Sequence, residues 1–256
     1  MKRGLVSITF RNLNCNEIVA LCAENSLKYV EWGGDIHIPA GNTGRAEEVR
    51  KLCADAGLVP VGYGSYYNAA ADIDGFYPAL DTAATLGAEY IRIWAGKKCE
   101  FDETVADIIA RCVDAAASRG IAVTLECHRW TMTEDPEIAA ELARRTGCRL
   151  HFQPNPDIPF ERNVYALRAS LPYLCACHVF AWEKGIAGVK GSDVRLPLSA
   201  KLDDWRQYYD IAPDAYYLME FVKDNTAAQL AEDAETLASL ASIARETDTA
   251  DGAKVK

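Results

Sequence analysis

Eight short β-rich runs alternate with longer Ala- and Leu-rich runs along the whole chain. The runs expected to be strands are residues 5–10, 29–33, 59–63, 90–94, 122–127, 149–153, 175–180 and 216–222. The helices expected between them include residues 17–24, 46–56, 103–119, 136–145 and 226–245. This alternation is typical of βαβ units built around a parallel sheet.

Eight parallel strands can form either an open doubly wound sheet or a closed barrel. The open sheet usually carries a glycine-rich phosphate turn after its first strand. Here that turn reads Arg-Asn-Leu-Asn over residues 11–14, without glycine. A chain of 256 residues that is 50% hydrophobic also suits one large core better than two. We therefore predict an α/β protein with a single (β/α)8 TIM barrel over residues 1–246, followed by a polar tail over residues 247–256.

Charge and composition exclude several classes of function. The formal net charge is -10, and the Lys and Arg residues are spread along the chain, which argues against nucleic-acid binding. No apolar run approaches the roughly 18 residues of a membrane span, and the first residues lack the apolar core of a signal peptide. The nine cysteines include no Cys-x-x-Cys pair. We expect a cytoplasmic protein with reduced thiols and no contact with membranes.

Polar side chains late in apolar strands are the candidates for chemistry, because active sites of such barrels lie at the C-terminal ends of the strands. Glu126 and Glu220 occupy such places, and each needs a cation or a hydrogen-bond partner if it is buried. Gln153 and His178 occupy equivalent places on the sixth and seventh strands. Two carboxylates, an imidazole and an amide oxygen suit a divalent ion, Mn²⁺ or Mg²⁺ before Zn²⁺ or Co²⁺.

Four segments resemble one known family. They are Val-Glu-Trp-Gly-Gly at 30–34, Ile-Arg-Ile-Trp-Ala-Gly at 91–96, Leu-Glu-Cys-His at 125–128 and Met-Glu-Phe at 219–221. Over residues 4–245 the chain resembles the xylose-isomerase-like, or AP-endonuclease-family-two, barrels, which include sugar isomerases, ketose 3-epimerases and inosose dehydratases. The resemblance implies that Glu126 and Glu220 bind a metal and move protons. One glutamate would remove a proton next to a carbonyl and the other would return it.

The sequence departs from the family pattern at two of the implied metal ligands. The family usually has an aspartate on strand six where Gln153 stands. Its strand-seven histidine usually lies three residues before an acidic residue, and counting back from Glu183 gives Phe180, so that His178 is one inward-facing position deeper. These differences leave open a barrel that binds its ligand without a metal and without catalysis.

Further residues near the predicted mouth receive candidate roles from their positions relative to the strands. The substrate-binding candidates are His37 after strand two, His128 on the same face as Glu126, Trp182 as a surface for a sugar ring, and Lys223 after strand eight. Arg92 and Lys223 could bind an anionic substituent or neutralise the glutamates. Glu31 is expected in a salt bridge. Residues 184–200, with three glycines, form a candidate lid.

The leading functional prediction is an isomerase or epimerase of a small polyhydroxylated substrate, free or phosphorylated. Two carboxylates that face one another suit a two-sided proton transfer. A dehydratase or lyase would use the same residues, because loss of water also begins with a proton removed beside a carbonyl. DNA-repair cleavage is disfavoured by four histidines in all and by the negative charge. A homodimer is compatible with the sequence.

Overall fold

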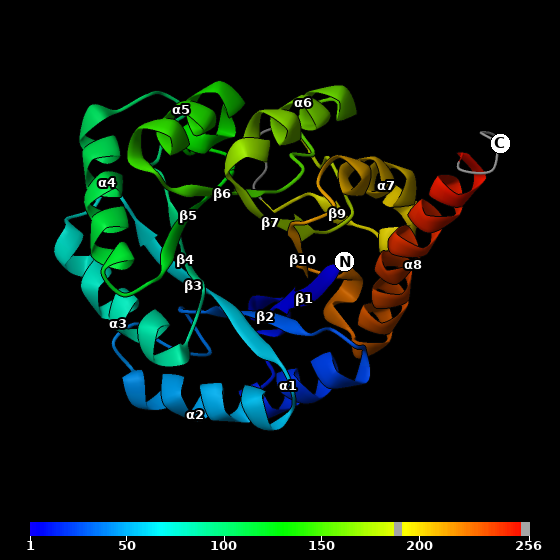
Figure 1. The fold of residues 1–256 in the computed structure, drawn as a ribbon, viewed down its shortest axis with the longest axis horizontal. Coiled ribbons are helices and arrows are strands. Elements are labelled where there is room, and N and C mark those ends of the chain that lie inside the picture. The colour runs from blue at the N-terminus through cyan, green and yellow to red at the C-terminus, as the bar shows by residue number, and fades with distance from the viewer. Residues whose placement is uncertain (187–190, 252–256) are drawn as a thin grey trace.

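Eight parallel strands close into a barrel in the computed structural model, which describes residues 1–186 and 191–251 (Figure 1). Each strand pairs with the next one along the chain, and the last barrel strand pairs with the first. The barrel strands are β1 (Lys2–Val6), β2 (Tyr29–Gly33), β3 (Val59–Asn68), β4 (Tyr90–Trp94), β5 (Ala122–Glu126), β6 (Arg149–Phe152), β7 (Leu174–Val179) and β10 (Tyr216–Met219). The predicted (β/α)8 barrel is confirmed.

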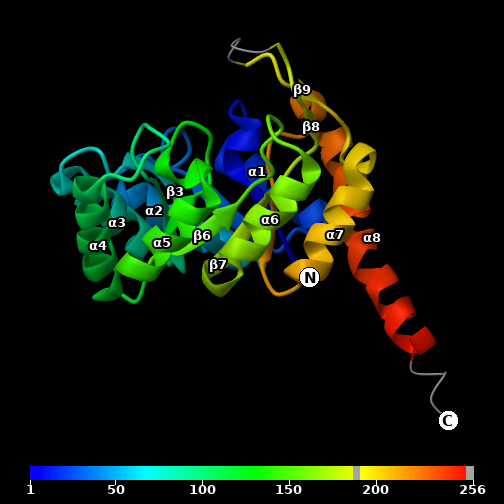
Figure 2. The same ribbon diagram turned by 90° about the horizontal axis from the view of Figure 1, so that it is seen from above.

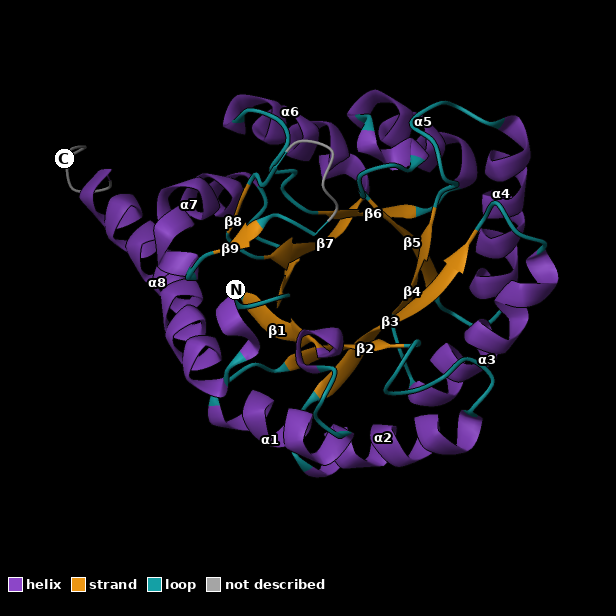
Figure 3. Ribbon diagram, turned by 180° about the vertical axis from the view of Figure 1, so that it is seen from behind, coloured by secondary structure: helices purple, strands orange, loops and turns teal. Residues whose placement is uncertain are grey.

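Helices surround the strands on the outside (Figure 3). They are α1 (Cys15–Glu24), α2 (Thr43–Asp55), α3 (Phe76–Leu86), α4 (Glu103–Ala117), α5 (Pro136–Thr146), α6 (Phe160–Ser170), α7 (Leu202–Ile211) and α8 (Ala227–Asp251). Several begin at a side chain that accepts backbone N–H groups of the first turn, such as Asp102 before α4 and Asp135 before α5. Gly147 ends α5 with φ 75°, a left-handed conformation in which glycine carries no steric penalty.

The apolar core has two parts. The larger lies between strands and helices, and Leu5, Ile91 and Leu125 are among its fully buried members. A smaller cluster, which includes Val6, Tyr90 and Leu218, consists of the alternate residues on the opposite face of the strands. These side chains fill the barrel interior below the charged residues described in the next subsection.

Several barrel strands, among them β1, β6 and β10, end earlier than the sequence predicted. The first strand was predicted over residues 5–10, but β1 ends at Val6 and Ser7–Phe10 form a 3-10 helix. The Ser7 hydroxyl accepts a hydrogen bond from the Gly33 backbone N–H at 2.8 Å. A side chain therefore replaces the backbone of the neighbouring strand as the partner of Gly33. Gln153 and Glu220 each lie one residue beyond the end of their strands, which places them at the rim.

The segment after β7 rises above the C-terminal end of the barrel on the side of α7 and α8 (Figure 2). It contains a two-stranded antiparallel sheet of β8 (Trp182–Glu183) and β9 (Val194–Arg195). Arg129 ties this hairpin to the rim through Asp193 at 2.6 Å and Asp157 at 3.0 Å. Of the candidate lid, residues 187–190 lie outside the described part of the chain.

The last helix runs further than expected. The domain boundary predicted at residue 246 falls inside α8, which continues to Asp251, and residues 252–256 of the predicted tail lie outside the described part. The nine cysteines form no disulfide, and seven of them are buried. Among the described residues, no helix is long and apolar enough to cross a membrane.

Candidate active site at the barrel mouth

A layer of charged and imidazole side chains lies inside the barrel above the apolar interior. It consists of Glu31 from β2, Arg92 from β4, His151 from β6 and His178 from β7, all of them buried. The strands place them there because alternate residues of a barrel strand face inward. Glu126, at the end of β5, and Glu220, just past β10, lie above this layer and are also buried.

Arg92 links two of the carboxylates. Its Nε donates to Glu31 Oε1 at 2.7 Å, and its guanidinium also contacts Glu126 Oε2, to which the Trp94 indole N–H donates as well. Burial alone would raise the pKa of Glu126, but Arg92, His178, His128 and the Trp94 indole together outweigh it and lower this pKa to about 2. Burial acts in the same way on Glu31, but Arg92 together with His151 and His178 holds its pKa well below the usual value. Both carboxylates are therefore ionised at neutral pH.

His178 lies between three carboxylates. Its Nδ1 is 3.4 Å from Glu220 Oε2 and 3.7 Å from Glu126 Oε1, and its Nε2 is 3.7 Å from Glu31 Oε1. Burial lowers the pKa of His178, but Glu220 and Glu31 more than offset burial and raise it. The pKa of Glu220 is raised, first by burial and then by Glu126, although His178 acts in the opposite direction. The two mouth glutamates therefore differ in proton affinity.

His151 completes the buried group from below. Its Nε2 lies 3.2 Å from Glu31 Oε2, to which the Tyr90 hydroxyl also donates at 2.9 Å. Burial lowers the pKa of His151 to about 4, against the opposing effect of Glu31, so its ring is neutral at neutral pH. The ring centres of His151 and His178 are 4.7 Å apart.

A cavity opens directly above this group. Its lining includes five residues predicted for the site: Glu126, His128, Gln153, Trp182 and Glu220. Phe180 also lines it, and the cavity volume is about 60 Å³. His178 does not line the cavity but contacts two of the carboxylates that do. The predicted convergence of polar groups from β5, β6, β7 and β10 is therefore present in the structure.

Two predicted substrate-binding residues lie elsewhere. Both ring nitrogens of His37 are engaged within the protein, Nδ1 with the Ser7 hydroxyl at 3.0 Å and Nε2 with the Leu13 carbonyl at 3.2 Å. Lys223 follows β10 with a half-exposed side chain 4.0 Å from Asp224. Neither lines the mouth cavity. Arg92 neutralises the glutamates, which is one of the two roles expected for it, and Glu31 makes the expected salt bridge.

Three of the buried residues form a possible metal site. Among the described residues, one ligand atom each from Glu31, His151 and His178 lie within 4.8 Å of one another. In the part of the chain that the structure describes, none of the four ring nitrogens of His151 and His178 makes a hydrogen bond, so each is available to an ion. Two imidazoles and a carboxylate fit a divalent ion chemically. The set expected from the sequence, Glu126, Gln153, His178 and Glu220, shares only His178 with this group.

TIM-barrel enzymes have their active sites at the C-terminal ends of the strands, which is where this barrel holds its buried carboxylates and histidines. The family model described as the xylose isomerase-like TIM barrel matches residues 19–211. The chain therefore belongs to the xylose isomerase-like TIM barrel family, as the resemblance in the sequence implied. Family, fold and buried site together indicate an enzyme of the sugar isomerase-like superfamily, with its reaction class open. No curated protein matches the chain.

Solved structures with the same fold are distant in sequence. A probable 3-DHS dehydratase, AsbF, involved in petrobactin synthesis in Bacillus anthracis, is 20% identical, with a TM-score of 0.74 over 93% of this chain and 99% of that one. A xylose isomerase domain containing protein from Salmonella typhimurium is 14% identical, with a TM-score of 0.73 over 93% and 96% of the two chains. A xylose isomerase-like TIM barrel protein from Mycobacterium smegmatis, solved in complex with magnesium, is 17% identical, with a TM-score of 0.65 over 91% of each chain.

Proposed function

We propose that this protein is an isomerase of a small polyhydroxylated carbonyl compound, in which Glu220 moves a proton between neighbouring carbons. The observation that carries the proposal is a pair of carboxylates in one cavity whose pKa values are shifted in opposite directions. In such a pair, one carboxylate can carry a proton while the other stays charged.

The roles follow from the contacts of each carboxylate. Glu126 is held ionised by Arg92 and Trp94, which makes it a poor base and a good acceptor for a substrate hydroxyl. Glu220 lacks the arginine and indole contacts of Glu126, and its ion-pair neighbour among the described residues is the His178 ring, with Nδ1 3.4 Å from Glu220 Oε2. Its raised pKa suits a group that takes up and returns a proton. His128 and Gln153 line the same cavity and offer further hydrogen bonds to hydroxyl groups.

The proposed reaction starts with the Glu220 carboxylate removing a proton from the carbon next to the carbonyl. The electron pair of the broken C–H bond moves into the carbonyl group and gives an enediolate. The Glu220 acid then returns the proton to the former carbonyl carbon, while the hydroxyl proton passes between the two oxygens. One glutamate thus serves both proton transfers, which favours an isomerase over the two-base epimerase that the sequence also allowed.

A dehydratase is the second candidate, supported by the same single proton carrier. After removing a proton beside the carbonyl, the Glu220 acid could protonate a leaving hydroxyl, so that water departs and an enone remains. The structural similarity to the probable 3-DHS dehydratase is compatible with this reaction. An enone absorbs in the ultraviolet, which distinguishes the two products.

The test is proton exchange in heavy water with a panel of small aldoses, ketoses and polyhydroxylated cyclic ketones, followed by NMR. We expect a C–H signal next to the carbonyl to disappear for at least one compound, with an isomeric product. An ultraviolet-absorbing product of lower mass would assign the dehydratase reaction instead. Folded protein that exchanges no carbon-bound proton in any compound would contradict both candidates and favour a non-catalytic binding barrel.

We also propose that Glu31, His151 and His178 bind a divalent ion. Imidazoles favour Zn²⁺ and the carboxylate favours Mn²⁺ or Mg²⁺, so this set moves the preference away from Mg²⁺ towards Mn²⁺ or Zn²⁺. A bound ion would supply positive charge behind Glu126 and Glu220. None of the three side chains lines the mouth cavity, so the proton transfers above are assigned to the chain's own residues.

Elemental analysis of protein purified without a metal-affinity tag tests this ion. We expect about one equivalent of divalent metal, lost in His151→Ala and His178→Ala and kept in Glu220→Gln. An ion at 100 times its dissociation constant should raise the free energy of unfolding by about 2.7 kcal/mol. Metal kept in His151→Ala and lost in Glu220→Gln would move the ion to the set with Gln153. Protein that stays metal-free after soaking in Mn²⁺ and Zn²⁺ would refute the site.

A further inference from the structure

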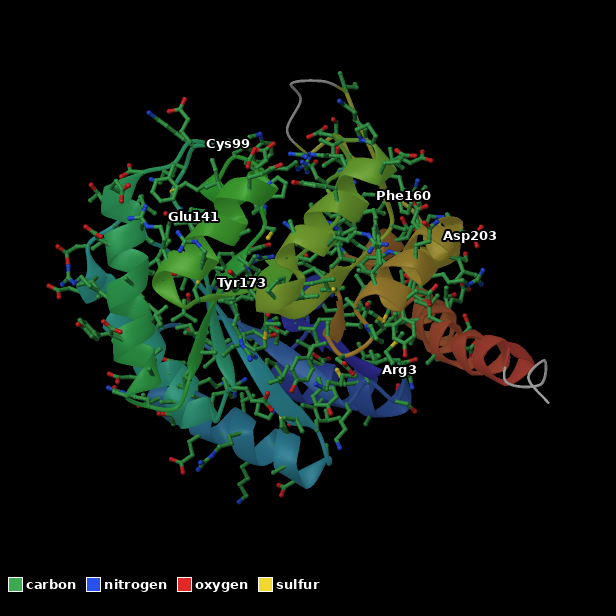
Figure 4. The ribbon with its side chains drawn as sticks, turned by 45° about the horizontal axis from the view of Figure 1, so that its top comes forward. Arg3, Cys99, Glu141, Phe160, Tyr173 and Asp203 are labelled. Atoms are coloured by element: carbon green, nitrogen blue, oxygen red, sulfur yellow. The ribbon has the colours of Figure 1, made fainter. Side chains whose placement is uncertain are left out.

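A second cavity lies beside the mouth cavity. Its volume is about 190 Å³, against about 60 Å³ for the mouth cavity. It lies between the loop after β6, the β8–β9 hairpin and the starts of α6 and α7, where Phe160 and Asp203 mark the two helices in Figure 4. The two cavities share Phe180, Trp182 and residues 154–156 as lining. They are therefore neighbours along one wall.

The dividing wall is aromatic. The rings of Phe180 and Trp182 have centres 4.6 Å apart and planes tilted by 33°. The Trp182 indole N–H is buried, and no hydrogen-bond partner for it is present in the described part of the chain. A buried indole N–H usually has an acceptor. A ligand that lies against this wall could supply one.

The second cavity combines aromatic faces with a polar rim. Besides the dividing wall, Phe160 contributes a partly exposed ring, whereas Trp205 and Tyr208 are 1% and 2% exposed and form the buried floor of the cavity. Its two lysines are already paired, Lys184 with Asp157 at 3.6 Å and Lys201 with Asp204 at 3.8 Å. The lining also holds two carboxylates, Glu183 and Asp204, against these two lysines. Because the charges of the lining balance, the cavity favours an uncharged ligand. Aromatic faces bordered by polar groups suit a sugar ring, which has apolar C–H faces and hydroxyl edges.

Size points to joint use of the two cavities. Pockets for small ligands usually span about 300–1,000 Å³. The mouth cavity alone is far below this range, whereas the two together approach its lower end. Because the two cavities share lining residues, a ligand with one ring at Glu126 and Glu220 reaches the second cavity as soon as it extends past the dividing wall.

We propose that the second cavity is a subsite for a second, uncharged sugar ring, so that the substrate is a glycoside or disaccharide. This inference rests on the proposed function for the position of the reacting ring. The first ring lies at the mouth glutamates, and the second lies beyond Phe180, against the partly exposed rings of Trp182 and Phe160. The Trp182 N–H then donates to a hydroxyl or glycosidic oxygen of the ligand.

Calorimetry with matched pairs of probes tests the subsite. The pairs are fructose with lactulose and isomaltulose, and glucose with cellobiose and maltose. We expect the two-ring member of at least one pair to bind about tenfold tighter or more, the effect of one additional stacked ring. Lys201→Trp places a bulky side chain at the half-exposed rim and should bring that ratio to about one without weakening the single-ring sugar.

Two further variants keep the test decisive. Ile158→Trp fills the same cavity from another segment and serves if Lys201→Trp fails to fold. Ala70→Trp fills a cavity beside Phe101, away from this site, and should leave the ratio unchanged. Equal affinities within every pair, binding of no probe, or a gain that both filling variants preserve would overturn the proposal. These results are independent of proton exchange, so failure of the subsite and failure of the isomerase reaction can be told apart.

Discussion

Replacing Arg92 with methionine is expected to lower the free energy of unfolding by about 3–5 kcal/mol, the usual cost of removing one partner from a buried ion pair. The Arg92 side chain is 4% exposed and contacts two carboxylates that are themselves buried. Its removal leaves Glu31 and Glu126 in the barrel interior without their main cation. Urea unfolding of the metal-free protein at neutral pH measures the change.

Two variants show whether the loss comes from uncompensated charge. Arg144→Met removes an exposed arginine that pairs with Glu141 on the surface of α5, and it should cost less than about 1 kcal/mol. The double variant Arg92→Met, Glu31→Gln should recover part of the stability because it removes one of the two stranded charges. A loss below about 1 kcal/mol in Arg92→Met would mean that other groups compensate these carboxylates.

Glu220→Gln is expected to lower the rate of isomerisation by about 10²–10⁴-fold, because the amide cannot carry the proton. Glu126→Gln should lower kcat/KM less, by about 10- to 100-fold, the value of one hydrogen bond to a charged group. The loss is smaller for Glu126→Gln because the contacts of Arg92 and Trp94 keep Glu126 ionised throughout the reaction. The rates are measured on the compound that exchanges its proton in heavy water.

Isotope transfer provides the decisive comparison. With a substrate deuterated at the reacting carbon, a single proton carrier returns part of the label to the product, whereas two bases replace it with solvent hydrogen. Glu235→Gln, an exposed change on α8, is the matched control and should leave the rate unchanged. Equal losses in the two mouth variants, together with no label in the product, would restore the two-base epimerase.

The fold could be predicted from the sequence because the alternating strand and helix runs, the first turn without glycine and the chain length all indicate a barrel. Strands 29–33 and 90–94 were predicted with their exact bounds, since glycine and charged residues limit the apolar run on both sides. The first strand was misplaced because residues 7–10 are as apolar and β-branched as a strand. Their conformation is set by contacts from distant residues, such as Gly33 to the Ser7 hydroxyl, which composition does not reveal.

The candidate site could be predicted only for residues at the strand ends. Glu126 and Glu220 stood out because a carboxylate is unusual in an apolar strand. His151 was missed, although it precedes Gln153 by two residues and so shares its inward face. That spacing was a usable signal. The pairing of Glu31 with Arg92 and His151 joins β2, β4 and β6, and nothing in a single sequence indicates the distances across a barrel.

The charged layer and the aromatic cavity are carried by different parts of the chain. Arg92, His151 and His178 belong to strands of the barrel, whereas Trp182 and Trp205 belong to the hairpin and the helix that follow β7. A substitution in the hairpin or in α7 can therefore change the preferred ligand without disturbing the buried ion pairs. In evolution, this separation would let a lineage acquire new substrates through the loops alone, while selection on folding stability keeps the buried charged layer beneath the mouth in place.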